Sequence, residues 1–165
     1  MKTLLNTKHT KVIEVEGKEM IERVPASAIL AITKDGDVIM VEQKRGSFGK
    51  ILEVPAGKVD AGEDPRTAAM RELTEETGYV AKTCYPLTSY YPSVGYTTEQ
   101  INCYFSNEIE DTGKQDLDAG EKIKVVKIKL DKLVRMIANG EVKDSKTLIC
   151  VYSFLTRHNP NLEKK

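Results

Sequence analysis

A mixed α+β fold is predicted by the order of the elements expected along this sequence. Segments typical of β-strands lie on both sides of one central helix, and two further helices close the chain. Strands gathered around a helix, with the other helices at the end of the chain, fit a layered α+β architecture. Because 40% of the 165 residues are hydrophobic, the chain can bury one sizeable core, and no composition break indicates a second globular domain.

The first part of the chain is expected to be β-structure. Five strands are predicted before the central helix, at residues 11–16, 18–24, 26–33, 38–43 and 52–54. Gly17 separates the first two strands as in a hairpin, and a Lys-Asp-Gly-Asp turn separates the next two. The fifth strand leads into a glycine-containing loop.

The central helix is framed by residues that start and stop helices. Asp64 suits the N-cap, Pro65 suits the first helical position, and Gly78 suits a left-handed C-terminal cap. Ala69 and Leu73 form an apolar stripe, so we expect this side of the helix to pack on the core.

Three strands and two helices are predicted after the central helix. The strands lie at residues 82–91, 99–105 and 123–129. Asp131 suits the N-cap of a helix that ends near Asn139, ahead of Gly140. Asp144 suits the N-cap of the last helix, whose apolar residues are Leu148, Val151, Phe154 and Leu155.

The segment from Gly57 to Tyr79 places three carboxylates behind a glycine loop. Residues three and four positions apart are neighbours on a helix surface, so Glu72, Glu75 and Glu76 project from one side. Like charges at this spacing cost about 0.2 to 0.5 kcal/mol per pair, which implies a compensating cation. Hard oxygen ligands without a nearby histidine or thiolate favour Mg²⁺, with Mn²⁺ as the alternative, over zinc.

The same segment fills every fixed position of the pattern G-x5-E-x7-R-E-U-x-E-E-x-G-U, where U is apolar or aromatic. Seven fixed residues at about 6% usage each would match by chance on the order of once in 10^8 to 10^9 positions. An ordinary solvated acidic helix explains neither the glycine loop nor the offset of Arg71. The chain therefore resembles the Nudix hydrolase family, which implies an α/β/α sandwich with a mixed central sheet and an N-terminal antiparallel strand pair.

The resemblance implies a diphosphate-cleaving site with a bound divalent metal. The implied metal ligands are Glu72, Glu75, Glu76 and the backbone carbonyl of Ala56, and Glu75 and Glu76 are also the implied catalytic residues.

Two further residues of the pattern are expected to support these ligands from behind. Arg71 is expected to orient Glu75 through a charge-assisted hydrogen bond. Glu63 is expected to stabilise the loop and the helix, with a purely structural role as the alternative.

Residues 12–155 further resemble one branch of the family, the ADP-ribose pyrophosphatases and related nucleotide-sugar hydrolases. The segments that carry this resemblance are residues 41–45, 52–57, 90–99 and 144–147. It implies substrate-binding roles for Arg45, Glu53, Tyr91 and Glu99. The alternatives are a surface charge for Arg45, binding of water at the metal site or a lysine partner for Glu53, and core or edge packing for Tyr91. One departure is Val94, which stands where the branch usually has proline, so the substrate is less firmly indicated than the reaction.

The branch also implies a glutamate general base in a loop before the last strand. Glu121 matches best by its distance from that strand, and Asp118 is the next candidate. A solvated acidic loop is the alternative interpretation.

These observations predict hydrolysis of the pyrophosphate bond of a nucleoside diphosphate linked to another moiety, with ADP-ribose, cut to AMP and ribose 5-phosphate, as the first candidate. Another nucleotide sugar, a dinucleoside polyphosphate, or a non-catalytic nucleotide-binding module are the alternatives. The branch implies a homodimer in which residues 1–24 form a strand extension that reaches the partner, next to a hydrolase domain at residues 25–165.

Charge and hydropathy exclude other broad classes of function. Basic and acidic residues both number 25, so the net charge of zero argues against broad binding to nucleic acid or an anionic membrane. The longest apolar stretches, residues 26–32 and 148–155, are too short to span a bilayer, and the N-terminus lacks an apolar segment of signal-peptide length. We expect a cytoplasmic protein whose three cysteines are reduced.

Overall fold

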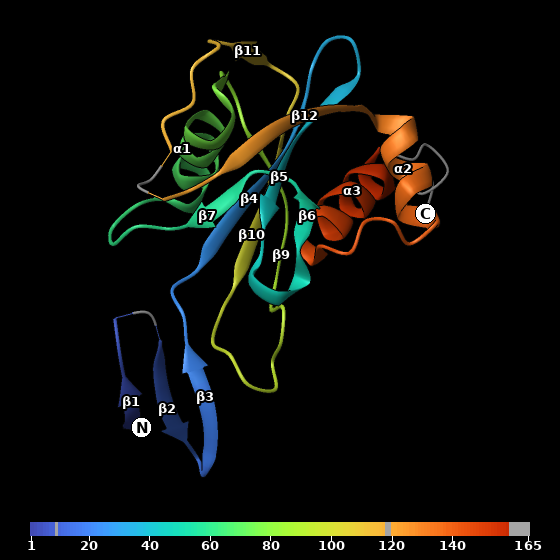
Figure 1. The fold of residues 1–165 in the computed structure, drawn as a ribbon. Coiled ribbons are helices and arrows are strands. Elements are labelled where there is room, and N and C mark those ends of the chain that lie inside the picture. Colours follow the sequence, from blue (N-terminus) through green and yellow to red (C-terminus); the bar gives the residue numbers. More distant parts are fainter. Residues whose placement is uncertain (9, 118–119, 159–165) are drawn as a thin grey trace.

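The computed structural model describes residues 1–8, 10–117 and 120–158. A central sheet lies between helix α1 (Pro65–Thr77) on one side and helices α2 (Leu130–Ala138) and α3 (Ser145–Arg157) on the other (Figure 1). A small separate sheet at the N-terminal end projects from this body. The predicted α+β fold with helices on both faces of a mixed sheet is therefore confirmed.

The central sheet has seven strands. Its main path runs β12 (Ile123–Lys129), β5 (Asp37–Lys44), β4 (Ala26–Ile32), β10 (Ile101–Ser106) and β9 (Tyr85–Tyr90), while β6 (Lys50–Glu53) pairs with β5 and β7 (Ala56–Lys58) pairs with β4. The sheet is mixed because β10 runs parallel to β4, whereas β5, β7 and β9 join their neighbours antiparallel.

Strand β4 shows how the sheet separates two cores. Ile29 and Ala31 pack in the cluster that contains α1, whereas Leu30 and Ile32 pack in the cluster that contains α2 and α3. Successive side chains of a strand point to opposite faces, so an unbroken apolar segment suits a strand that is covered on both sides. This central strand fixes α1 against the sheet, and α1 carries the acidic residues.

Helix α1 begins and ends as the sequence predicts. The Asp64 side chain accepts hydrogen bonds from the backbone N–H groups of Arg66 and Thr67, at 3.0 and 3.2 Å. Gly78 ends the helix in the left-handed conformation, with φ 74°. Ala69 and Leu73 are fully buried against the sheet, which leaves the acidic side of the helix facing away from the core.

The two C-terminal helices differ in how they are capped. Asp144 caps α3 as expected, because its carboxylate accepts a hydrogen bond from the N–H of Thr147 at 2.9 Å. The prediction that Asp131 caps α2 is wrong: Lys129 is the N-cap, the helix starts at Leu130, and Asp131 lies in its first turn. There it forms an ion pair with Arg135 at 2.9 Å, one turn along the helix.

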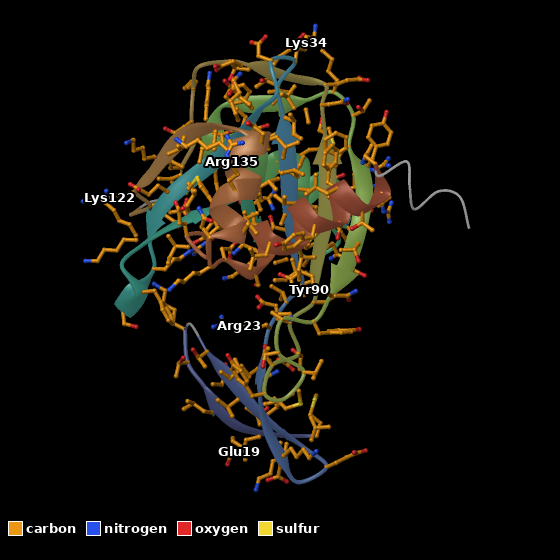
Figure 2. The ribbon with its side chains drawn as sticks, turned by 90° about the vertical axis from the view of Figure 1, so that its right-hand side faces the viewer. Glu19, Arg23, Lys34, Tyr90, Lys122 and Arg135 are labelled. Carbon is orange, nitrogen blue, oxygen red and sulfur yellow. The ribbon has the colours of Figure 1, made fainter. Side chains whose placement is uncertain are left out.

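The N-terminal sheet has three strands, β1 (Lys2–Asn6), β2 (Lys11–Val15) and β3 (Lys18–Glu22), so a further strand joins the expected pair. Every residue of β1 is exposed, and this segment lacks the half-buried alternation that marks a strand in sequence. The sheet is joined to the body by hydrogen bonds of Ile21 with Tyr96 and Thr98, at 2.7 and 3.1 Å. Figure 2 shows Glu19 at the far end of the sheet and Arg23 where the chain enters the body.

Several short elements have no counterpart in the sequence-based prediction. They are β7, a two-stranded sheet of β8 (Tyr79–Ala81) and β11 (Ile109–Asp111), and a 3-10 turn at Gly46–Phe48. The expected strand at residues 82–91 begins only at Tyr85. A strand of three residues is too short to show the alternation of apolar and polar residues that marks a strand in sequence. Whether such a segment forms a strand depends on the strand with which it pairs. Among the helices of the described residues, none has the length and apolar content needed to cross a bilayer.

The packing of α1 yields a stability prediction. Leu73→Ala should lower the free energy of unfolding by about 2 to 5 kcal/mol, because Leu73 is fully buried and the change leaves a cavity. Urea denaturation followed by circular dichroism measures the loss. Val94→Ala is the matched control, since Val94 is 77% exposed and should give a change near zero. Equal stability of the two variants would contradict the packing of Leu73 in the core.

Candidate active site

One pocket of about 730 Å³ lies beside the acidic side of α1. Its wall has an acidic part formed by Asp60, Glu72, Glu75, Glu76, Glu99, Asp116 and Glu121. It has a cationic part formed by Arg45, Lys58, Arg71 and Lys146, and the remaining wall is Ala26, Gln43, Ala56, Gly57 and Ile101. Both signs of charge therefore face the same space, which suits a ligand that carries anionic groups and a cation.

Glu76 is the most buried acid of the pocket wall. It is 5% exposed, and its Oε2 accepts a hydrogen bond from the backbone N–H of Ala56 at 3.0 Å. Burial raises the pKa of Glu76 to about 8, and the nearby charges of Glu72 and Glu121 act in the same direction. A carboxylate in such surroundings is stabilised by a cation beside it.

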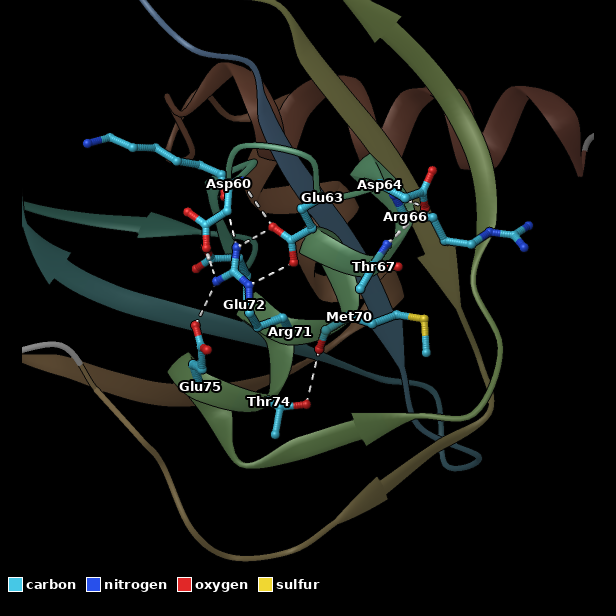
Figure 3. Close-up of polar contacts among 11 residues, drawn as sticks. Asp60, Glu63, Asp64, Arg66, Thr67, Met70, Arg71, Glu72, Thr74 and Glu75 are labelled. Carbon is cyan, nitrogen blue, oxygen red and sulfur yellow. Dashed lines mark hydrogen bonds and ion pairs between the residues drawn. The ribbon is translucent and has the colours of Figure 1, made fainter.

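Arg71 ties the loop before α1 to the acidic side of the helix (Figure 3). Its Nε and Nη2 each lie 3.0 Å from the carboxylate of Glu63, and its Nη1 lies 2.8 Å from both Glu72 and Glu75. Nη2 also donates to the carbonyl of Lys58 at 2.9 Å. These bonds raise the pKa of Arg71, and Glu63 makes the largest contribution. The guanidinium thereby fixes the loop and two of the predicted metal ligands relative to one another.

Gly57 permits the loop to pass directly over α1. A Cβ atom at this position would collide with the carboxylate of Glu72, so any other residue would displace one of the two. The loop is held in place by β7, in which Ala56 pairs with Ala28 of the central strand. Glycine at this position therefore lets the backbone approach the Glu72 carboxylate closely, without displacing that side chain.

The carboxylates of Glu72, Glu75 and Glu76 suit a hard divalent cation by their chemistry. Its predicted ligands are all oxygen atoms, and burial raises the pKa of Glu72 as well as that of Glu76. Within residues 1–8, 10–117 and 120–158, however, no three acidic, histidine or cysteine side chains already converge as a formed metal site. Glu72 and Glu75 each form an ion pair with Arg71 at 2.8 Å.

A second ion-pair network stands behind the cationic part of the wall. Glu53 is 2% exposed. Its carboxylate accepts hydrogen bonds from Nε and Nη2 of Arg45, at 2.7 and 2.8 Å, and from Nζ of Lys146, at 3.1 Å. Lys146 also pairs with Asp144 at 2.6 Å. Burial alone would raise the pKa of Glu53, but Arg45 and Lys146 outweigh burial, so its pKa is lowered. Glu53 thus holds two cations at the pocket.

The predicted site residues are distributed unevenly. Arg45, Glu99 and Glu121 line the pocket, whereas Glu53 lies behind its wall and has the lysine partner that was the alternative to substrate contact. Tyr91 is 59% exposed and does not belong to the described wall. The alternative base, Asp118, lies outside the described residues.

Lys146 is the main pocket residue to which sequence reasoning gave no role. Its side chain is 17% exposed, and it reaches the pocket from the first turn of α3. The available signal was its position two residues after the helix-capping Asp144, within a segment that carries the branch resemblance. Lys146 and Glu53 are 93 positions apart in the sequence, so only the fold reveals the hydrogen bond between them.

Comparisons with known proteins give matches over most of the chain. The NUDIX domain family model matches residues 22–148. An "ADP-ribose pyrophosphatase" of Bacillus subtilis (strain 168) is 36% identical over 136 residues, which cover 81% of this chain and 74% of the relative. The "Methanol dehydrogenase activator" of Bacillus methanolicus is 38% identical over the same shares.

A solved structure provides an independent comparison of the fold. It is described as an "ADP compounds hydrolase", and it superimposes with a TM-score of 0.79 over 96% of this chain and 92% of its own. At 19% identity, this similarity concerns the fold. The family match over most of the chain and the two bacterial relatives go further, and they show that this chain belongs to the Nudix family.

Proposed function

We propose that this protein is a metal-dependent hydrolase that cuts the pyrophosphate bond of a nucleoside diphosphate linked to another moiety. ADP-ribose, cut to AMP and ribose 5-phosphate, is the leading substrate. The main support is the pocket, in which buried Glu76 and two other carboxylates of α1 face the cations Arg45 and Lys146. The relative named ADP-ribose pyrophosphatase supports the choice of substrate.

The cationic wall is suited to hold the diphosphate. Phosphate anions repel an attacking nucleophile, so neutralising and positioning them is the main task of such a site. Arg45 presents a planar guanidinium that can bind two phosphate oxygens, and Glu53 fixes its orientation from behind. Lys146 is fixed in the same way by Glu53 and Asp144. We propose that both side chains contact the diphosphate.

The acidic wall is suited to hold the metal. Glu72, Glu75, Glu76 and the carbonyl of Ala56 would bind Mg²⁺, with Mn²⁺ as the alternative. Such an ion, when bound, neutralises phosphate charge and makes a water more acidic. We propose that Glu121 accepts the proton of the attacking water at its carboxylate, because it lines the pocket and its charge acts on both Glu72 and Glu76. Arg71 keeps Glu75 in place at 2.8 Å.

A substrate panel tests this proposal directly. The purified protein with Mg²⁺ should hydrolyse ADP-ribose to AMP and ribose 5-phosphate with a higher kcat/KM than UDP-sugars, GDP-sugars, diadenosine polyphosphates or NADH. Products are identified by chromatography, and chelation with EDTA should abolish turnover. Preference for another member of the panel would change the substrate. Binding without turnover of any of them would favour the non-catalytic nucleotide-binding module.

Glu76→Gln should reduce kcat by roughly 100-fold or more, because it replaces a carboxylate that would bind the metal with a neutral amide. The fold should persist, since the amide oxygen can still accept the hydrogen bond of Ala56. Activity is measured at saturating Mg²⁺, and the melting temperature reports the fold. Glu110→Gln on exposed β11 is the matched control and should retain full activity. Near-normal turnover of Glu76→Gln would exclude Glu76 as a metal ligand.

The N-terminal sheet supports a proposal about assembly. We propose that residues 1–24 form an extension to the hydrolase domain at 25–165 and contact a second copy of the chain in a homodimer. Leu4 and Leu5 on β1 are exposed apolar side chains on a sheet that projects from the body, and Val24 is exposed just after β3. Exposed apolar side chains on such a projecting sheet are suited to an interface.

Sedimentation should give a mass twice the 18.4 kDa of one chain at micromolar concentration. Leu5→Glu should shift the protein toward monomer, because it places a charge in the proposed apolar contact. Glu14→Gln on the neighbouring strand β2 serves as the control and should keep the dimer. A monomeric wild-type protein would refute the proposed assembly.

A further inference from the structure

The segment that precedes Glu121 lies directly against the C-terminal end of α1. Thr112 donates to the carbonyl of Gly78 through its backbone N–H at 2.9 Å and through its hydroxyl at 2.7 Å. A Cβ atom at Gly78 would lie 2.9 Å from the backbone nitrogen of Lys114, so the two backbones are in close contact. This segment and the end of the acidic helix therefore form one packed unit.

The last carbonyls of α1 find their partners in this segment. The final carbonyl groups of a helix have no hydrogen-bond donor within the helix itself. Here the backbone N–H of Asp116 donates to the carbonyl of Glu75 at 2.9 Å. The side-chain Nε2 of Gln115 donates to the carbonyl of Glu76 at 2.6 Å. The two acceptors belong to residues whose side chains face the pocket.

Gln115 makes a second contact, across the loop that carries Glu121. Its Nε2 lies 3.4 Å from the carbonyl oxygen of Ile123, the first residue of β12 and two positions after Glu121. Both acceptors are carbonyl oxygens, so only the NH₂ group of the amide can serve them. A single donor group thus joins the end of the acidic helix to the start of β12.

From this geometry we infer that Gln115 is a positioning residue that sets Glu121 relative to the acidic face of α1. The inference rests on the proposed function, in which Glu121 accepts a proton from water. Glu121 lines the pocket from the loop that ends at β12, and Gln115 holds that end of the loop to the helix. The backbone carbonyls carry the contact, so Gln115 acts on position without touching the substrate.

Gln115→Met tests the inference, because methionine keeps the length of the side chain and removes the donor. We expect kcat to fall roughly three- to tenfold, as for the loss of a hydrogen bond, with KM within twofold of wild type. Gln115→Asn keeps the amide but shortens its reach, and it should lower kcat in the same way. Gln115 is exposed, so both variants should fold with nearly unchanged melting temperatures. Lys114→Met, whose exposed side chain precedes Gln115, is the control and should retain wild-type kcat.

The decisive measurement is a double-mutant cycle with Glu121→Gln. If Gln115 acts through Glu121, then Gln115→Met should have almost no further effect on kcat in the Glu121→Gln background. An equal fall in both backgrounds would overturn the inference and leave the proposed function standing. A wild-type rate for Glu121→Gln would overturn both the inference and the base assignment. Absence of hydrolysis by the wild-type protein would instead refute the proposed function itself.

Discussion

The geometry of the pocket depends on one guanidinium, that of Arg71. Its donors reach the carboxylate of Glu63, the carbonyl of Lys58 and two carboxylates of α1. Without this cation, the acidic side of α1 would place like charges one turn apart, and the loop would lose the hydrogen bonds that Glu63 and the carbonyl of Lys58 accept from Arg71. Arginine suits this position because its planar group offers five donors in fixed directions.

Charge balance extends the same logic to the rest of the pocket. Glu53 is almost fully buried, and such a carboxylate is tolerated only when paired cations compensate for the loss of hydration. Arg45 and Lys146 provide that compensation, and both remain in the pocket wall. A buried acid therefore serves to hold two cations in place. Glu76, the most buried acid of the pocket wall, accepts a hydrogen bond from the backbone N–H of Ala56, and burial raises its pKa.

Local signals predicted the larger elements well. The strand at residues 123–129 has the predicted bounds, and α1 has the expected caps at Asp64 and Gly78. Where a local signal was weak or had competing outcomes, the prediction was incomplete or wrong. Strand β1 is exposed along its whole length, and Asp131 pairs with Arg135 instead of capping α2. In each case a partner from elsewhere in the chain or one turn away decided the outcome.

The sequence by itself determined the family, the acidic helix and the central position of Arg71, because these depend on residue spacing within one segment of 23 residues. The tertiary structure decided which other residues share the pocket with that helix. Lys146 reaches it from the C-terminal helix, Glu53 lies behind it, and Tyr91 lies apart from its described wall. Helical period and capping chemistry act over a few residues, whereas contacts between distant segments follow from how the sheet aligns its strands.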